Sequence, residues 1–268
     1  MTNSLNPIGI FDSGVGGLTV VKAVMDALPA ENIIYFGDTA RVPYGTKSKE
    51  TVTKFSEQNI RFLLTKNVKA VIIACNTVSS NSYNELRERF DLPLIEVVTP
   101  GVEYCLSQIR EKRVGVIGTE ATIRSAAYER AIRERDGGVK VFSKACPLFV
   151  PLAEEGWVNN NVALAAAGIY LAEFVENGVD ALILGCTHYP LLTDCIKRIT
   201  GGIKIIDPAK AVAERVKETL AAAGLLNGGE NPPSREFYVS DNTQKFERIS
   251  LAVLGRPYEA VKVDIERY

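Results

Sequence analysis

The sequence predicts an α/β protein built on parallel sheets, and three observations carry that prediction. Short runs rich in Ile, Val and Leu alternate with longer stretches whose apolar residues recur at helical spacing. Most positions in these runs are apolar, as in strands of parallel sheets that are buried on both faces. The chain of 268 residues is long enough for one large α/β domain or two ordinary ones, and we expect two.

The apolar runs are the expected strands. They cover residues 8–11, 33–36, 70–74, 94–97, 114–117, 139–142, 181–184 and 203–206. Between them lie two clear helical patterns, with apolar residues at Val20, Val24 and Leu28 and at Val212, Val216 and Leu220. Asp207-Pro208 precedes the second pattern as an N-cap followed by proline at the first helical position. Alternating strands and helices predict right-handed crossovers.

Proline and glycine mark the expected domain boundaries. One lies at residues 98–101 (Val-Thr-Pro-Gly) and a second at 207–208. Residues 1–98 together with 208–268 should form a first α/β domain, and residues 99–207 a second. The composition of residues 227–234 predicts a surface loop, and the tail at 237–268 should pack back on the first domain.

Charge and hydropathy exclude several classes of function. Lys and Arg total 31 against 32 for Asp and Glu, a net charge of -1, and the basic residues are scattered, which disfavours nucleic acid as the main ligand. The opening segment lacks a basic and apolar leader, and the most apolar stretch, 162–172, is too short to span a bilayer. We expect a cytoplasmic protein that does not bind membranes.

Five cysteines and a single histidine limit the redox and metal chemistry. The cysteines, at positions 75, 105, 146, 186 and 195, form no CxxC pair and no cluster of zinc spacing. Neither a metal site nor a disulfide framework is therefore expected, and the thiols should be reduced. Cys105 and Cys195 fall inside helical patterns and Cys146 in an irregular stretch, which favours a role in the core for all three.

The two halves of the chain look like copies of one another. Residues 8–13 (IGIFDS) and 70–77 (AVIIACNT) have counterparts at 114–119 (VGVIGT) and 181–188 (ALILGCTH). Cys75 and Cys186 thus occupy equivalent places, just past the carboxyl end of a strand and before a polar turn that opens a helix. Ligands of open α/β sheets bind at that edge.

The placement of this pair indicates acid/base chemistry. A helix N-terminus lowers the pKa of a thiol and so favours the reactive thiolate. Either cysteine alone could be a small buried hydrophobe, but a matched pair in repeated contexts favours catalysis. Two identical acid/base groups facing each other across a ligand suit the inversion of a stereocentre, because one removes a proton and the other delivers one. A cysteine hydrolase would instead need one nucleophile with a separate base and an oxyanion hole.

Two loops and the histidine offer further candidates. The loop at 11–19 (FDSGVGGLT) has glycines whose N–H groups an anion could approach, although it is neither GxGxxG nor a P-loop. Asp12 and Ser13 there could accept a hydrogen bond from a substrate ammonium, or Asp12 could merely cap the helix. The segment 37–45 offers hydroxyls and amides around Pro43, Tyr44 and Gly45, or a plain turn. His188 could help to protonate or polarise a substrate beside Cys186, or it could be an incidental packing residue; its place two residues after Cys186 favours function.

Four motifs together resemble a known family. Residues 11–17 (FDSGVGG), 37–45 (GDTARVPYG), 74–77 (ACNT) and 185–190 (GCTHYP) resemble the bacterial glutamate racemases of the aspartate/glutamate racemase superfamily, from about residue 7 to residue 226. The resemblance implies two doubly wound, mainly parallel-sheet domains related by pseudo-two-fold symmetry, with the active site in the interdomain cleft. It also implies that the enzyme uses no pyridoxal phosphate, metal or nucleotide. A homodimer that supplies D-glutamate for peptidoglycan synthesis in the cell wall is implied as well.

The resemblance also assigns roles to residues. Cys75 would take the α-proton from D-glutamate and Cys186 from L-glutamate, each acting as the acid in the other direction. Asp12 and His188 would assist the thiols, and Glu154, or its neighbour Glu155, would be an auxiliary carboxylate. The implied substrate contacts are Asp12, Ser13, Pro43, Tyr44, Gly45, Asn76, Thr77, Thr187 and His188.

Two rival functions remain open. A relative of the same two-thiol design could act on aspartate or broadly on acidic amino acids. A protein that keeps the fold could instead work by contacting a partner, as some glutamate racemases are thought to do with DNA gyrase. The near-neutral charge gives that second alternative no support, and the presence of both cysteines speaks against it.

Overall fold

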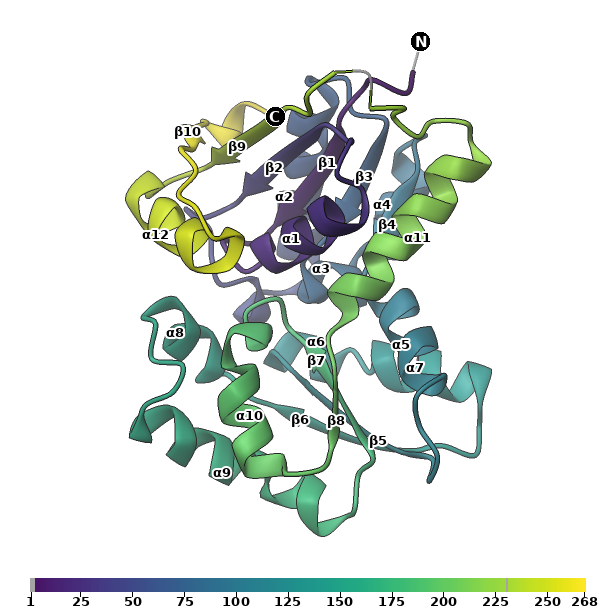
Figure 1. Ribbon diagram of the computed structural model, residues 1–268, viewed down its shortest axis with the longest axis vertical. Helices are drawn as coiled ribbons and strands as arrows, with labels where there is room; N and C mark the ends of the chain where they lie inside the picture. Colours follow the sequence, from purple (N-terminus) through teal and green to yellow (C-terminus); the bar gives the residue numbers. More distant parts are fainter. Residues whose placement is uncertain (1–2, 230) are drawn as a thin grey trace.

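The computed structural model describes residues 3–229 and 231–268, which form two parallel sheets flanked by helices (Figure 1). The strands of the first sheet are β1 (Ile8–Asp12), β2 (Ile33–Gly37), β3 (Ala70–Ile73), β4 (Leu94–Glu96), β9 (Arg235–Val239) and β10 (Val261–Lys262). Those of the second are β5 (Arg113–Gly118), β6 (Lys140–Ala145), β7 (Ala181–Gly185) and β8 (Lys204–Ile206). The predicted α/β class with two mainly parallel sheets is confirmed.

The strand order repeats between the two sheets. The first sheet runs β10-β9-β2-β1-β3-β4 and the second β6-β5-β7-β8, so the first four strands of each half have the same order. Every pairing is parallel. The internal repeat in the sequence is therefore a repeat of topology, in which β3 corresponds to β7. All of the predicted strands are present, and β9 and β10 were not anticipated.

Helices pack on the faces of both sheets. Around the first sheet lie α1 (Leu18–Ala27), α2 (Lys49–Leu64), α3 (Asn76–Asn81), α4 (Tyr83–Arg89), α11 (Pro208–Ala222) and α12 (Thr243–Leu254). Around the second lie α5 (Val98–Leu106), α6 (Glu120–Arg124), α7 (Ala127–Arg135), α8 (Phe149–Glu154), α9 (Asn161–Glu176) and α10 (Thr193–Thr200). The short 3₁₀ turns are η1 (Tyr44–Thr46), η2 (Tyr189–Leu192) and η3 (Ile265–Arg267). None of the helices in the described parts of the chain has both the length and the apolar character needed to cross a membrane.

The start of α11 agrees with its predicted cap. The Asp207 carboxylate accepts a hydrogen bond from the Ala209 N–H at 3.0 Å, and Pro208 occupies the first helical position. Residues 98–101, where a domain boundary is expected, form the first turn of α5 and not a loop. Proline is tolerated there since its missing N–H would have had no partner within the helix.

The division of the chain follows from the two cores. Val98, Val102 and Cys105 of α5 join the cluster under the second sheet, whereas Val212 and Val216 of α11 join a cluster under the first. We therefore propose residues 1–98 with 208–268 as one domain and 99–207 as the other, with the side chain of Val98, at the boundary, packing in the second core.

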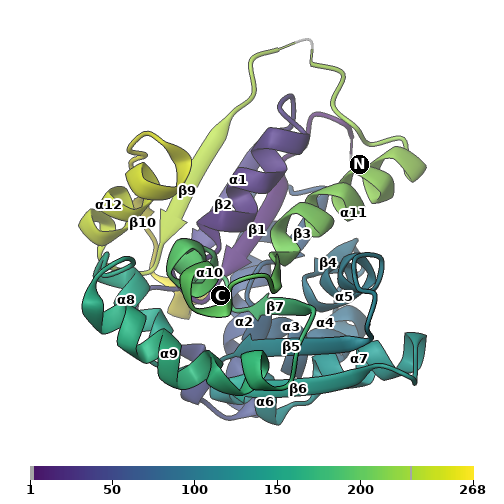
Figure 2. The ribbon, with the colours of Figure 1, turned by 60° about the horizontal axis from the view of Figure 1, so that its bottom comes forward.

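The C-terminal tail packs on the first half, as predicted. Strand β9 pairs with β2 in the register Ile33↔Arg235, and Phe237 and Phe246 lie in the core beside Tyr35. Helix α12 of the tail lies next to α8 of the other half (Figure 2). The described residues of the loop expected at 227–234 contain no helix or strand; residue 230 lies outside the described residues, as do residues 1 and 2 of the opening segment.

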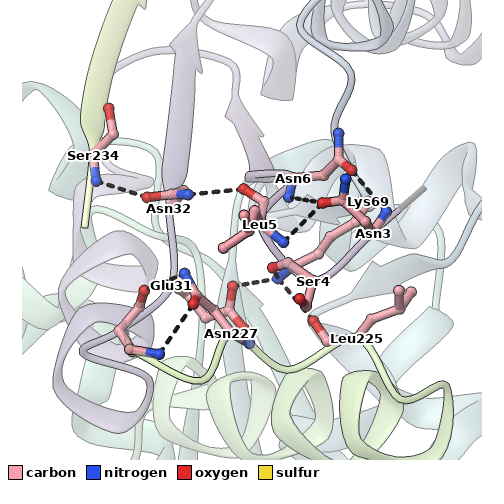
Figure 3. Close-up of polar contacts among 12 residues, drawn as sticks. Asn3, Ser4, Leu5, Asn6, Glu31, Asn32, Lys69, Leu225, Asn227 and Ser234 are labelled. Carbon is pink, nitrogen blue, oxygen red and sulfur yellow. Dashed lines mark hydrogen bonds and ion pairs between the residues drawn. The ribbon is translucent and has the colours of Figure 1, made fainter. Parts of the chain in front are cut away.

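A buried ion pair closes the amino-terminal edge of the first sheet (Figure 3). Lys69 Nζ lies 2.5 Å from Glu31 Oε2, and the two side chains are 0% and 2% exposed. The ammonium also donates to the backbone carbonyls of Ser4 at 2.6 Å and Leu225 at 2.9 Å. Glu31 Oε1 accepts from the Asn227 N–H at 2.9 Å. The pair thus ties the N-terminal segment and the connector after α11 to the start of β3.

Candidate active site

Cys75 and Cys186 follow equivalent strands of the two sheets. Cys75 lies one residue beyond the end of β3, and it is the N-cap residue of α3. Cys186 comes directly after β7 and is followed by the 3₁₀ turn η2, so no α-helix starts at it. Both thiols therefore lie at the carboxyl edges of their sheets, where the predicted site was placed.

One small cavity between the halves joins the two thiols. Its lining consists of Ser13, Val42, Pro43, Tyr44, Gly45, Cys75, Asn76, Thr77, Thr119, Val150, Cys186, Thr187 and His188. It encloses about 30 Å³, which is room for one or two water molecules. Cys75 and Cys186 are 4% and 5% exposed. The structure thus brings together all of the predicted site residues except Asp12 and Glu154, which lie just behind this lining.

Asp12 stabilises the glycine-rich loop and reaches the other half. Its Oδ2 accepts hydrogen bonds from the N–H groups of Gly14 at 3.1 Å and Gly17 at 3.0 Å, so these two amides already have a partner. Its Oδ1 accepts a longer bond from the Thr187 hydroxyl at 3.4 Å. Asp12 is therefore not the side-chain N-cap of α1, whose N-cap residue is Gly17; its carboxylate orders the loop before that helix and links the loop directly to the residue after Cys186.

Glycine is required where this loop meets the second half. A Cβ on Gly16 would lie 2.5 Å from Thr187 Oγ1 and 2.6 Å from His188 Nδ1, closer than real Cβ atoms come. Gly45 of η1 is similarly constrained, since its Cβ would lie 2.6 Å from Thr119 Cβ. Close packing between the halves thus accounts for these glycines, which the sequence had suggested as an anion cradle and as part of a turn.

The Cys75 thiol is less acidic than its place at a helix N-terminus predicts. Burial, followed by the negative charge of Asp12, raises the pKa of Cys75 to about 12. The Ser13 hydroxyl, 3.5 Å from the sulfur, and the N–H of Val78 in α3 act in the opposite direction and are outweighed. The loss of hydration in a nearly closed cavity thus raises the pKa of the thiol by more than the N-terminus of the short helix α3 lowers it.

Cys186 is the first member of a chain of polar contacts. Its sulfur lies 3.8 Å from His188 Nδ1, and His188 Nε2 lies 3.1 Å from Glu154 Oε1. Burial by itself lowers the pKa of His188, but its contacts with Cys186 and Glu154 and the charge of Asp12 raise that pKa to about 10. Burial likewise opposes ionisation of Glu154, but His188 and Lys245 lower its pKa to about 2. The geometry favours an imidazolium held between a carboxylate and a sulfur.

The contact with His188 also distinguishes the two adjacent glutamates. Glu154 ends α8 with its carboxylate against the imidazole, and its side chain is 14% exposed. Glu155 is the exposed C-cap residue of the same helix.

The polar side chains of Tyr44, Asn76 and Thr77, three further predicted residues, already have hydrogen-bond partners within the protein. The Tyr44 hydroxyl donates to Asp38 and accepts from Asn59 at 3.2 Å, so its polar end points away from the cavity. Asn76 accepts from the Tyr128 hydroxyl at 2.5 Å, and Thr77 lies 3.0 Å from Thr119, hydroxyl to hydroxyl. Both of these contacts join the first half to the second.

Several residues at the site were not predicted. Thr119 lines the cavity directly after β5, at the place that Ser13 occupies after β1, so the internal repeat could have identified it. Val42, Val150 and Lys245 had no comparable signal in the sequence. The other three cysteines are buried in the core clusters, as expected, and burial raises the pKa of Cys105 to about 12 and that of Cys146 further.

A duplicated α/β fold that places one thiol from each half in a shared cavity is the arrangement expected of a racemase. Comparison with known proteins agrees. The family model for Asp/Glu/Hydantoin racemase matches residues 10–216. The chain belongs to this family, and it is an isomerase of the amino-acid racemase class.

The individual relatives narrow the family to proteins named glutamate racemase. The chain is 46% identical over 258 residues to the glutamate racemase of Neisseria meningitidis serogroup A, covering 96% of each chain. It is 49% identical over 249 residues to that of Geobacter metallireducens, covering 92% of each. The solved structure of the Francisella tularensis glutamate racemase in complex with D-glutamate superposes with a TM-score of 0.93 at 41% identity, covering 99% of this chain and 100% of that one.

Proposed function

We propose that the protein interconverts L-glutamate and D-glutamate without a cofactor, with Cys75 and Cys186 as the two bases. The observation that carries this proposal is the shared cavity, into which equivalent strand ends of the two sheets each bring one buried thiol. The choice of glutamate rests on the names of the relatives at 46% and 49% identity.

The two thiols alone account for the proton that leaves Cα and for the proton that replaces it. The thiolate on one face removes the α-proton and becomes a thiol, which leaves the electron pair on Cα. The thiol on the other face then delivers its own proton to Cα and becomes the thiolate. Cys186 acts as the base toward L-glutamate and Cys75 toward D-glutamate, so each turnover leaves the enzyme ready for the reverse reaction.

Asp12, His188 and Glu154 assist the thiols in this proposal. An α-ammonium beside Asp12 would offset the carboxylate charge that opposes ionisation of Cys75. His188, backed by Glu154, would stabilise the Cys186 thiolate and return a proton to it. The substrate carboxylates would be bound, and the charge that develops on them stabilised, by the backbone N–H groups of Tyr44 and Gly45 and by the side chains of Ser13, Asn76, Thr77 and Thr187.

Substrate binding requires the halves to separate. A cavity of about 30 Å³ is too small for glutamate, which has ten non-hydrogen atoms. The contacts that close it join the two halves, as between Thr77 and Thr119. We infer that the halves open to admit glutamate and close again to exclude water from the reacting carbon.

Pure, cofactor-free protein in deuterated water tests the function. We expect L-glutamate to lose its optical rotation while deuterium enters only at Cα, because the proton that returns comes from a thiol that has exchanged with solvent. L-aspartate assayed in parallel should react much more slowly. A preference for aspartate would replace the proposed substrate, and retention of rotation with both amino acids would refute the racemase activity.

The physiological setting is part of the same proposal. We place the protein in the cytoplasm, where D-glutamate would be supplied to peptidoglycan synthesis for the cell wall. No contact with DNA gyrase is proposed, since the near-neutral chain offers no feature that supports one.

We also propose a homodimer, and the outer face of α9 supports it. Val162, Ala165, Ile169 and Ala172 form an exposed apolar ridge on this helix, with Val162 52% and Ile169 74% exposed. We expect the mass in solution, measured by light scattering, to be that of a dimer, and Ile169→Glu to shift it to that of a monomer. A wild-type protein that is monomeric at micromolar concentration would contradict this expectation.

A further inference from the structure

The carboxylate behind His188 has a second cationic partner, which comes from the other half of the molecule. Lys245 Nζ lies 2.7 Å from Glu154 Oε2, while Glu154 Oε1 faces His188. Lys245 belongs to α12, which is anchored to the first half by the buried side chains of Phe246 and Ile249. Glu154 ends α8 in the second half, and both figures place these two helices side by side (Figures 1 and 2).

This ion pair is partly shielded from solvent. The side chains of Lys245, Glu154 and His188 are 27%, 14% and 4% exposed. Charges at such depth interact more strongly than those of exposed surface pairs. Each oxygen of one carboxylate thus serves one cation, in the order Lys245, Glu154, His188 and Cys186.

We propose that Lys245 is a positioning residue of this site, which holds the Glu154 carboxylate against His188 and shares its negative charge. The inference rests on the proposed function, since it concerns the proton that His188 exchanges with Cys186. A carboxylate with no other partner binds the imidazolium proton tightly. Sharing the carboxylate with Lys245 weakens that hold, so His188 can pass its proton to the Cys186 thiolate and make it the thiol that acts as the acid.

The pair also links proton transfer to closure of the site. Its two members come from different halves, and Arg248 of α12 adds a hydrogen bond to the backbone carbonyl of Glu154 at 3.4 Å. When the halves separate to admit glutamate, the carboxylate loses Lys245 and binds the imidazolium proton more tightly. Closure brings the lysine back and makes the proton available when the substrate is enclosed.

His188 can be observed directly because it is the only histidine in the chain. The charged and titratable groups that face it are Cys186 on its own strand end, Asp12 from β1, Glu154 from α8 and, through Glu154, Lys245 from α12. Labelling histidine with ¹⁵N in a protein without a histidine tag gives one imidazole whose titration can be followed by NMR. This measurement needs no substrate.

We expect Lys245→Met to move the midpoint of the His188 titration upward by about one pH unit, because a cation that opposes the imidazolium has been removed. Lys245→Arg should keep the wild-type midpoint. Arg248→Met is the matched control, since it removes the other contact between α12 and Glu154 without altering the carboxylate's partners, and it should leave the midpoint unchanged. An unmoved midpoint in Lys245→Met, or an equal shift in Arg248→Met, would overturn the proposal.

The kinetics provide a second measurement. The equilibrium constant of a racemisation is one, so kcat/KM must change equally in both directions. We expect kcat of Lys245→Met to fall about tenfold from D-glutamate to L-glutamate, where Cys186 is the acid, and less in the reverse direction. Equal losses in both directions would contradict the assigned role. Absence of racemisation in the wild type would instead refute the proposed function, and the NMR titration would still decide the role of Lys245.

Discussion

Cys75→Ala and Cys186→Ala are each expected to lose racemisation of glutamate by about 1,000-fold or more. Positioned acid/base groups contribute roughly 100- to 10,000-fold each, and inversion at Cα needs one group on each face. With a single thiol left, a proton can be taken from one face but not delivered to the other. The measurement is the initial rate of loss of optical rotation, together with deuterium entry at Cα.

Two further variants separate chemistry from packing in this experiment. Cys75→Ser keeps the size of the side chain but replaces the thiol with a far weaker acid, so it should be as inactive as the alanine variant. Cys105→Ala removes a buried thiol of α5 that lines a core and not the cavity, and it should retain the wild-type rate. Racemisation that survives in either Cys75→Ala or Cys186→Ala would require a one-base scheme or another base.

Lys69→Met is expected to destabilise the protein by about 3–5 kcal/mol, although Lys69 is far along the sheet from the site. Methionine fills a similar volume but leaves the Glu31 carboxylate buried, with the Asn227 N–H as its remaining hydrogen-bond donor. The backbone carbonyls of Ser4 and Leu225 also lose their donor. Urea unfolding followed by circular dichroism gives the difference in free energy of unfolding.

The double variant Lys69→Met/Glu31→Leu is the control for that prediction. Because the cost arises from one uncompensated charge, removing its partner as well should recover most of the lost stability. Losses that simply add in the double variant would contradict a coupled pair. Glutamate racemisation by the folded single variant should remain close to the wild-type rate, since the pair lies at the amino-terminal edge of the sheet.

The strands were predictable because parallel strands are buried on both faces and therefore consist mostly of apolar residues. Runs such as residues 70–74 and 181–184 are apolar at every position and are followed by a polar turn, and a charged residue interrupts only three of the eight runs, at Glu96, Lys140 and Lys204. Strands β9 and β10 carry no continuous apolar run, because β10 is the exposed edge strand of the first sheet and β9, beside it, is only partly buried. The place of β9 is fixed by pairing with β2, about 200 residues earlier in the chain, and that of β10 by pairing with β9.

The candidate site was predictable where its residues lie in motifs that recur in both halves of the chain. The motif copies placed Cys75 and Cys186 at equivalent strand ends, and the same comparison could have identified Thr119 as the counterpart of Ser13. Lys245 could not be found in this way, because α12 has no counterpart in the other half and its lysine resembles any other lysine on a helix. The acidity of Cys75 was not predictable either, since the local sequence shows the helix N-terminus but not the burial that outweighs its effect on the pKa.

The sequence by itself determined the α/β class, the internal repeat of strand motifs and the two thiols, because these depend on hydrophobic periodicity and on short motifs within each half. Only the tertiary structure decided how the halves meet: the cavity shared by both thiols, the close approach of Gly16 to His188, and the ion pair from α12 to Glu154. Those contacts join residues far apart in the chain. Their energies depend on distance and burial, which no local pattern of residues records.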